Sequence, residues 1–330
     1  MHFLPHSVLL MPAEQARQVV RRPQPRPIPS RACLPATNFK AADDLMLNDL
    51  MLRAGAPLAM ATWLLYKAFR ERRAVHLDGQ LVLISGASSG IGRELALLLT
   101  ARGAEVIIVA RREAALKEVE REVEARGWGG RIYALPCDCS DGSAVEELVE
   151  KVRAIWGDAG PDVVVNCAGA GRWLMLDEST VEEVAACFHA PLLAAANMCR
   201  AFIQDMKSKG AGTFVQVQSP GAVTSWGGCT AYLASRWALR GLSLALQADL
   251  RGSGVLVQEV ILPEVDSEYW RNNPGSRQRV PWLGRFLGVP NISSRKAAVY
   301  VARAIESRAG FTCFGGTLPL LIQLNLVLPR

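Results

Sequence analysis

Short apolar runs alternate with amphipathic stretches through the middle of the chain. Leu81–Ile84 and Val106–Val109 are too short for helices and fit strands that are buried on both faces. Between them, Leu95, Leu98 and Leu99 recur at the spacing of one helix face. This stretch therefore predicts a strand, a helix and a second strand in succession.

The same alternation continues almost to the end of the chain. Because strands that alternate with helices form parallel sheets, it predicts an α/β fold. We expect a Rossmann-like, doubly wound parallel sheet in a single domain over residues 78–330, preceded by an N-terminal extension. Further strands are expected at Arg131–Pro136, Val163–Val165, Thr213–Gln218 and Val255–Leu262, and further helices at Glu113–Arg126, Asp141–Trp156, Thr180–Lys207 and Tyr232–Leu250.

A glycine-rich turn lies between the first strand and its helix. Glycines let a backbone approach a ligand closely, and a helix N-terminus presents free N–H groups and the positive end of its dipole. A pyrophosphate is the natural anion for this arrangement, so the turn predicts a dinucleotide site. The residues expected to contact the dinucleotide here are Gly86, Ser88, Ser89, Gly90, Ile91 and Gly92.

Composition narrows the class of protein. The chain has 330 residues, is 50% hydrophobic and carries a net charge of +6, much of it within the first 75 residues. That distribution favours targeting or membrane contact over a nucleic-acid surface. The eight cysteines form no CxxC pair, which favours reduced thiols and no metal site.

The first 44 residues are basic and rich in proline. Residues 1–42 hold six Arg or Lys residues against one acid, Glu14, and the prolines prevent a long helix. Such a segment is typical of an organelle transit peptide, for a chloroplast or a mitochondrion. A disordered basic tail without a targeting role is the alternative.

Residues 45–77 combine an apolar stretch with basic flanks. Ala54–Tyr66 has no charge over thirteen residues, and four basic residues follow it within residues 67–73. Thirteen residues are too few to span a bilayer, which takes about 20. A helix lying on a membrane surface therefore fits best, and a helix docked on protein is the alternative.

The glycine spacing GxxxGxG in SGASSGIG resembles that of the short-chain dehydrogenase/reductase family, over roughly residues 78–305. Cofactor choice depends on the end of the second strand, where an acid would bind a ribose 2′-hydroxyl. Arg111 and Arg112 stand there instead and favour the 2′-phosphate of NADP(H). If these arginines are merely solvated, NAD(H) is the alternative. The resemblance further implies that Asp138 contacts the adenine and that Asn166, Ala168 and Gly169 line the nicotinamide-side ribose.

The family pattern also implies a reaction centre. Tyr232 follows Ser219 by the thirteen positions that the family shows, and Arg236 stands four residues later on the same helix face. Tyr232 would exchange a proton with the substrate oxygen, and Ser219 would hydrogen-bond that oxygen. The family has lysine where this chain has Arg236, which retains the positive charge beside Tyr232 but cannot join a proton relay in the same way.

Two further positions depart from the family. Its asparagine in the helix before the serine strand aligns with Pro191, which has no polar side chain and should kink the helix. A misplaced alignment is the alternative. After the sixth strand, Pro263 is expected at the cofactor, but Glu264 replaces the family's glycine, and Ser267 is a candidate for its threonine.

A substrate lid is expected over about residues 264–295. The aromatic residues Trp226, Tyr269, Trp270, Trp282 and Phe286 suggest a pocket for a bulky apolar carbonyl or alcohol. The uncharged stretch 311–328 predicts a terminal strand and then an apolar helix that meets membrane, substrate or another subunit, so a homo-oligomer stays open. The functional prediction is an NADP(H)-dependent oxidoreductase acting on a small hydrophobic substrate. A nucleotide-binding protein of this fold with impaired catalysis, serving as a sensor or structural subunit, is the alternative.

Overall fold

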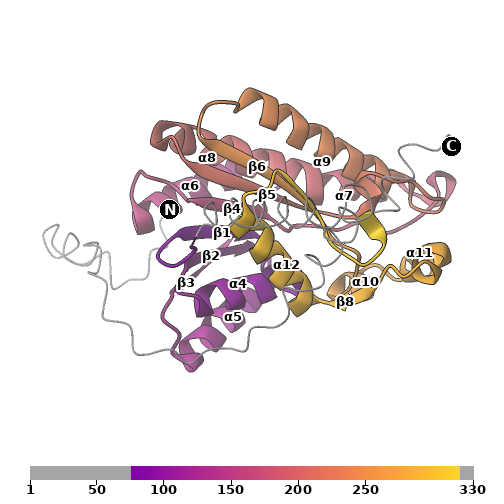
Figure 1. The fold of residues 1–330 in the computed structure, drawn as a ribbon, viewed down its shortest axis with the longest axis horizontal. Coiled ribbons are helices and arrows are strands. Elements are labelled where there is room, and N and C mark those ends of the chain that lie inside the picture. The colour runs from indigo at the N-terminus through magenta and orange to yellow at the C-terminus, as the bar shows by residue number, and fades with distance from the viewer. Residues whose placement is uncertain (1–75, 320–330) are drawn as a thin grey trace, which may run out of the picture. The chain divides into compact units, whose positions relative to one another are not determined.

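The computed structural model describes residues 76–319, and the predicted targeting segment, nearly all of the predicted membrane-surface helix and the last residues of the apolar C-terminal stretch lie outside them. Seven parallel strands form the central sheet in the order β3-β2-β1-β4-β5-β6-β9 (Figure 1). Their bounds are β1 Leu81–Ser85, β2 Glu105–Ala110, β3 Ile132–Pro136, β4 Val163–Asn166, β5 Gly212–Gln218, β6 Val255–Ile261 and β9 Phe311–Cys313. The predicted doubly wound α/β fold is confirmed.

Alternating side chains of the central strand face two different cores. Val82 and Ile84 of β1 belong to a core shared with α4 Gly90–Ala101, α5 Glu113–Arg126 and α12 Ser294–Ser307. Leu81 and Leu83 face the other core, and all four side chains are fully buried. Burial on both faces explains why the strand is an unbroken apolar run. The helices of the second face are α6 Gly142–Trp156, α8 Ala194–Lys209 and α9 Thr230–Asp249.

The expected long helix after β4 is interrupted. α7 Val181–Phe188 passes through a π-helical turn, His189–Leu193, into α8. Pro191 is buried in this turn and has no N–H to donate, so the regular ladder of helix hydrogen bonds is broken there, as the sequence predicts. By composition Val181–Lys209 is long and apolar enough to cross a membrane, but Met198 and Phe202 of α8 are fully buried against the sheet, which marks a core helix.

Short elements make up the segment between β6 and α12. β7 Glu264–Asp266 pairs in parallel with β8 Asn291–Ser293, and α10 Glu268–Asn272 and α11 Trp282–Phe286 lie between them. This segment follows the carboxyl end of β6.

The strand order of the main sheet marks where a ligand would bind. Because β1 and β4 are neighbours although β2 and β3 intervene in sequence, the chain reverses direction across the sheet between β1 and β4. Ligands of open α/β sheets bind in the crevice at such a point.

Candidate active site

The glycine turn between β1 and α4 leaves no room for side chains. Gly86 has φ +70°, and a Cβ on it would lie 2.7 Å from the backbone N of Ala168. A Cβ on Gly92 would lie 2.5 Å from the carbonyl oxygen of Gly86. Only glycine lets the end of β1, the start of α4 and the loop after β4 approach this closely.

The N-terminus of α4 opens onto a cleft of about 900 Å³. The N-cap residue Ser89 makes no side-chain cap, and the first turn of the helix contains no acid. Free N–H groups and the positive end of the helix dipole therefore face the cleft, where they would bind a phosphate. All six residues predicted for this turn line the cleft: Gly86, Ser88, Ser89, Gly90, Ile91 and Gly92.

The end of β2 brings positive charge to the same cleft. Arg111 and Arg112 line it, and Arg112 Nη2 donates a hydrogen bond of 3.1 Å to Ser88 Oγ. Asp138, after β3, also lines the cleft and accepts hydrogen bonds from the hydroxyl and the N–H of Ser140. Partial burial acts to raise the pKa of Asp138, but these hydrogen bonds and the charge of Arg111 outweigh it and lower the pKa. Asp138 is therefore ionised and held in place.

The loop after β4 only partly follows expectation. Ala168 and Gly169, which are predicted to line the nicotinamide-side ribose, line the cleft. The Asn166 side chain lies behind that lining, 4% exposed, where it accepts from Ser85 Oγ at 3.4 Å and donates to Cys199 Sγ at 3.8 Å. Its side chain thus braces β1, β4 and α8, which differs from the predicted contact with the nicotinamide ribose.

The predicted reaction centre is brought together in the cleft. Ser219 follows β5, while Tyr232 and Arg236 lie on α9, and all three line the cleft. The guanidinium carbon of Arg236 is 5.0 Å from the centre of the Tyr232 ring. Arg236 Nη1 donates to the Val217 carbonyl at 3.5 Å, and a Cβ on Gly169 would lie 2.9 Å from Arg236 Nη2. The Arg236 side chain thus reaches from the tyrosine ring to the loop after β4.

Arg236 is an unusual buried cation. The residue is 7% exposed, and its Nε has no hydrogen-bond partner within residues 76–319. Among those residues no carboxylate forms an ion pair with it. The pKa of the buried Cys187 thiol is raised by burial, and the charge of Arg236 acts in the opposite direction. A positive charge held this close to Tyr232 without a neutralising acid stabilises negative charge there.

Ser219 is oriented by its own turn. Its Oγ accepts a hydrogen bond of 3.2 Å from the N–H of Gly221. A hydroxyl that accepts from a backbone N–H keeps its own proton available for another acceptor. Ser219 can therefore donate a hydrogen bond to an oxygen atom in the cleft.

The two departures in sequence have different structural consequences. Pro191 is buried and does not line the cleft, whereas its neighbours His189 and Ala190 do. Pro263 and Glu264 both line the cleft. Glu264 Oε1 pairs with Arg277 Nε at 3.1 Å, so the lid supplies a cation against the extra acid.

An aromatic wall surrounds Tyr232. The Trp173 ring lies 5.1 Å from the Tyr232 ring, 5.5 Å from Trp226 and 5.4 Å from Trp270, between ring centres. Tyr269 lies 6.4 Å from Tyr232 and 5.2 Å from Trp270. Trp173 was missed in the sequence analysis, because it stands in a loop without periodicity. The one signal that could have identified it is its position four residues after Gly169.

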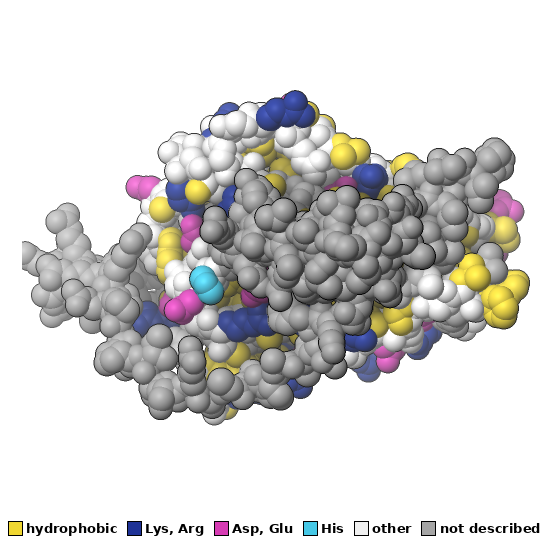
Figure 2. Space-filling view, in the orientation of Figure 1, with side chains coloured by type: hydrophobic (Ala, Val, Ile, Leu, Met, Phe, Trp, Pro, Cys, Tyr) yellow, Lys and Arg dark blue, Asp and Glu magenta, His cyan; other side chains and the backbone are white. Residues whose placement is uncertain are grey.

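Two predicted pocket residues lie elsewhere. Trp282 and Phe286 of α11 are 72% and 76% exposed, so the prediction that they line the pocket was wrong. The space-filling view shows hydrophobic side chains on the surface where α11 lies (Figure 2). The helix turns Gly284 toward the cleft instead, and Val280 and Pro281 just before it also line the cleft.

Hydrogen bonds tie the lid to the loop after β4. Trp173 N donates to Ser276 Oγ at 2.9 Å, and Trp173 Nε1 donates to the Tyr269 hydroxyl at 3.0 Å. The Tyr269 hydroxyl donates in turn to the Gly171 carbonyl at 2.6 Å. Burial raises the pKa of Tyr269 well above its usual value, so it stays protonated and can act as this donor.

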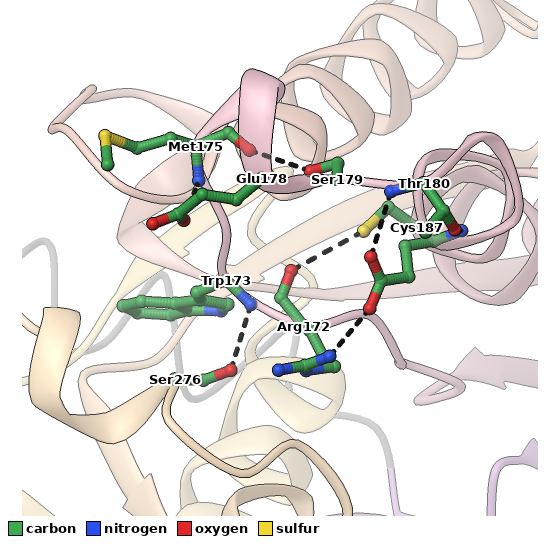
Figure 3. A network of polar contacts seen from close by, with 9 residues as sticks. Arg172, Trp173, Met175, Glu178, Ser179, Thr180, Cys187 and Ser276 are labelled. Carbon is green, nitrogen blue, oxygen red and sulfur yellow. Dashed lines mark hydrogen bonds and ion pairs between the residues drawn. The ribbon is translucent and has the colours of Figure 1, made fainter.

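Figure 3 shows the same loop from close by, with the Trp173 main chain turned toward Ser276. Arg172 Nη1 pairs with Glu183 at 2.7 Å, and the carboxylate of Glu183 also accepts from the N–H of Thr180, whose hydroxyl caps the start of α7. These contacts fix the loop that carries Trp173, and therefore fix the aromatic wall against Tyr232.

The comparisons with known proteins agree with this geometry. A short chain dehydrogenase family model matches residues 80–277. Among curated proteins, 3-ketodihydrosphingosine reductase of Bos taurus is 31% identical over 226 residues, covering 66% of this chain and 67% of that protein. A Mycobacterium bovis protein named "Probable oxidoreductase EphD" is 38% identical over 176 residues, which cover 53% of this chain, and the match spans only 29% of that relative's length.

Solved structures give the same result. A short-chain dehydrogenase from Streptomyces avermitilis is 28% identical with a TM-score of 0.63, and the match covers 76% of this chain and 93% of that one. A metagenomic short-chain oxidoreductase in complex with NADP is 28% identical with a TM-score of 0.59, over 73% of this chain and 98% of that one. With its glycine turn and its Ser219–Tyr232 pair on a seven-stranded parallel sheet, this chain belongs to the short-chain dehydrogenase/reductase family of oxidoreductases.

Proposed function

We propose that the chain is an NADP(H)-dependent oxidoreductase that interconverts a hydrophobic carbonyl compound and its alcohol. The observation that carries the proposal is the convergence of Ser219, Tyr232 and the unpaired cation of Arg236 on the cleft that the glycine turn opens. A serine donor, a tyrosine proton source and a fixed positive charge are the groups that carbonyl reduction needs at the oxygen.

The residues at the end of the cleft near β2 fit a nucleotide that bears a 2′-phosphate. Gly86 and Gly92 form a cradle that a Cβ would fill, and the N–H groups of α4 face the cleft, where a pyrophosphate would bind. Arg111 and Arg112 would hold the 2′-phosphate, and Asp138 the adenine. When bound in this cleft, a nicotinamide cofactor would supply the hydride in the reducing direction or accept it in the oxidising direction.

The protein's own residues would handle the proton. In the reducing direction Tyr232 gives its hydroxyl proton to the carbonyl oxygen, which becomes the alcohol, and in the oxidising direction it accepts that proton. Ser219 donates a hydrogen bond to the same oxygen and so stabilises the negative charge that develops on it. Arg236 stabilises the tyrosinate left behind. Because a guanidinium does not give up its proton as a lysine ammonium can, it acts as a fixed charge and passes no proton.

The aromatic wall supports a bulky apolar substrate. Trp173, Trp226, Tyr269 and Trp270 present mostly apolar ring surface beside Tyr232. Long-chain and ring-bearing ketones bury their surface in such a pocket, whereas small polar sugars would leave it empty. The similarity to a reductase that is named for a keto sphingoid base supports a ketone with a long apolar chain.

A nucleotide-binding protein without efficient turnover is the second candidate. It is favoured by Arg236 in place of the family's lysine and by Pro191, whose ring sits in the π-helical turn next to the cleft. The organelle location, the attachment to a membrane surface and self-association are further proposals, and they rest on segments outside residues 76–319 as well as on the apolar surface at α11.

The experiment that tests the proposal follows NADPH consumption by the purified chain with a series of straight-chain and ring-bearing ketones. Tyr232→Phe should remove the activity, while the matched control Tyr300→Phe, on α12 and stacked on Phe314, should keep it. Tight NADPH binding without consumption of any ketone, or activity that survives in Tyr232→Phe, would contradict the oxidoreductase proposal and favour the second candidate.

A further inference from the structure

Glu268, the first residue of lid helix α10, lies beside the cleft and does not line it. Together with Ser88, Gly90 and Arg112 it lines a groove that adjoins the nucleotide end of the cleft. Glu268 Oε2 is 3.7 Å from Arg112 Nη2, the nitrogen that also donates to Ser88 Oγ at 3.1 Å. The other carboxylate oxygen, Oε1, lies 3.1 Å from Arg271 Nη2. Arg112 is therefore held between the glycine turn and the lid.

The contact is exposed enough to exchange partners. The Arg112 and Glu268 side chains are 55% and 40% exposed, and the pair is long for an ion pair. Surface pairs of this kind contribute little stability, so a more highly charged anion can replace the carboxylate. The 2′-phosphate of NADP(H) carries more charge than a carboxylate and presents three oxygens to a guanidinium.

Other charged side chains line the groove that Glu268 shares with Arg112. Arg93 pairs with Glu94 and Glu122, and Arg277 pairs with Glu264 and Asp266. Glu118 is exposed in the groove. Within residues 76–319, Glu268 is the one carboxylate that pairs with Arg112.

The same five-residue helix also carries the substrate wall. Tyr269 and Trp270 directly follow Glu268. Tyr269 is hydrogen-bonded to Gly171 and Trp173, and Trp270 Nε1 donates to the Val265 carbonyl. A displacement of Glu268 is therefore a displacement at the start of the helix that supports the aromatic wall.

We propose that Glu268 is a cofactor-specificity residue that competes with the 2′-phosphate of NADP(H) for Arg112 and accepts a hydrogen bond from the free 2′-hydroxyl of NAD(H). This inference rests on the proposed function, because it assumes a nicotinamide dinucleotide in the cleft. Glu268 weakens NADP(H) binding by occupying Arg112 and by repelling the phosphate. It strengthens NAD(H) binding, since a carboxylate is the acceptor that a ribose hydroxyl prefers. When the 2′-phosphate displaces Glu268 from Arg112, the lid helix α10 loses this contact with the nucleotide end of the cleft.

The test measures dissociation constants of NADPH and NADH for the full chain and for Glu268→Gln, which keeps the size of the side chain and removes its charge. We expect NADPH to bind several-fold more tightly and NADH several-fold more weakly, so that the ratio of the two constants changes about tenfold. Glu118→Gln, in the same groove but not paired with Arg112, is the matched control and should change the ratio less than twofold. A loss of structure alone would weaken the binding of NADPH and of NADH together.

A second measurement reports the lid. Adenosine 2′,5′-bisphosphate should speed amide hydrogen exchange in residues 268–272, and 5′-AMP should not. Equal rates of amide hydrogen exchange with the two nucleotides would contradict the proposal that the lid helix responds to the 2′-phosphate. A wild-type preference for NADPH that is unchanged in Glu268→Gln would overturn the specificity role while leaving the proposed function intact. If the unmutated chain binds neither cofactor, the proposed function fails first, and this inference fails with it.

Discussion

Replacing Arg236 by glutamine removes the one charge that lies against Tyr232 without a neutralising carboxylate among the described residues. The guanidinium carbon lies 5.0 Å from the centre of the tyrosine ring. At that separation a unit charge stabilises an opposite charge by about 0.8 kcal/mol in water-like surroundings and by about 3.3 kcal/mol at an effective dielectric constant of about 20. Because Arg236 is 7% exposed, the upper part of this range applies.

The expected cost in the transition state is therefore about 2–3 kcal/mol, which lowers kcat by about 30- to 150-fold. The assay compares kcat for ketone reduction at saturating NADPH with the dissociation constant of NADPH measured separately. The charge acts on the developing tyrosinate, so kcat should fall more than NADPH affinity does. Arg200→Gln, which removes an equal charge from an exposed ion pair between α8 and α6, is the control and should leave kcat unchanged.

The reasoning is refuted if Arg236→Gln keeps the kcat of the unmutated protein. It is also refuted if the whole loss appears in NADPH affinity, because the arginine would then hold the cofactor and not the charge on Tyr232. If both kcat and the affinity for NADPH fall, Arg236→Lys distinguishes the two roles. Lysine retains the charge with a shorter reach and should recover most of kcat.

Three further predictions concern the walls of the cleft. Gly86→Ala should abolish nucleotide binding in a titration and lower the free energy of unfolding by about 1–3 kcal/mol, because the φ of Gly86 is +70° and Ala168 leaves no room for a Cβ. Gly129→Ala, where a Cβ would meet open space, is the control and should be neutral. Trp173→Ala should raise KM for apolar ketones and lower the free energy of unfolding by about 3–5 kcal/mol in a denaturant titration, while Trp282→Ala on the exposed face of α11 should do neither. Iodoacetamide at pH 8 should modify Cys137 before the other described cysteines, and mass spectrometry would show the order. A hydrogen bond from Cys139 lowers the pKa of Cys137, whereas burial raises the pKa of Cys199, for example, to about 12. Since thiolate forms as pH rises through the pKa, labelling of Cys137 should begin at lower pH, and bound NADPH should block it; equal rates at all sites would contradict this.

The sheet was predictable because its determinants are local, whereas the candidate reaction centre was predicted from the spacing of the family that the sequence resembles. An apolar run four or five residues long, followed by glycines and then a helical pattern, allows only one kind of element at each step. The relation between Tyr232 and Arg236 is equally local, since residues four apart on a helix share a face. Ser219 was predicted from the family's thirteen-residue spacing to Tyr232, and the structure places it directly after β5.

The walls of the cleft were not predictable in the same way. Trp173 meets Ser276 across 103 positions of sequence, and no periodicity connects them. The exposure of Trp282 and Phe286 shows the limit of composition, because an aromatic residue in a lid has the same pattern whether it faces the cleft or the solvent. The position of the Asn166 side chain was equally unpredictable, because it is set by a buried partner, Cys199, on helix α8.

The weight of the three departures from the family pattern changes once their partners are known. Glu264 looks damaging in sequence because it adds a negative charge beside the cofactor, but Arg277 of the lid lies against it at 3.1 Å. Arg236 retains a buried positive charge over Tyr232. Pro191 removes a polar group and lies behind the cleft lining, whereas His189 of the same turn lines the cleft. The second candidate therefore depends on whether proton exchange with solvent needs a polar side chain at position 191, and a slow but Tyr232-dependent reduction would show that it does not.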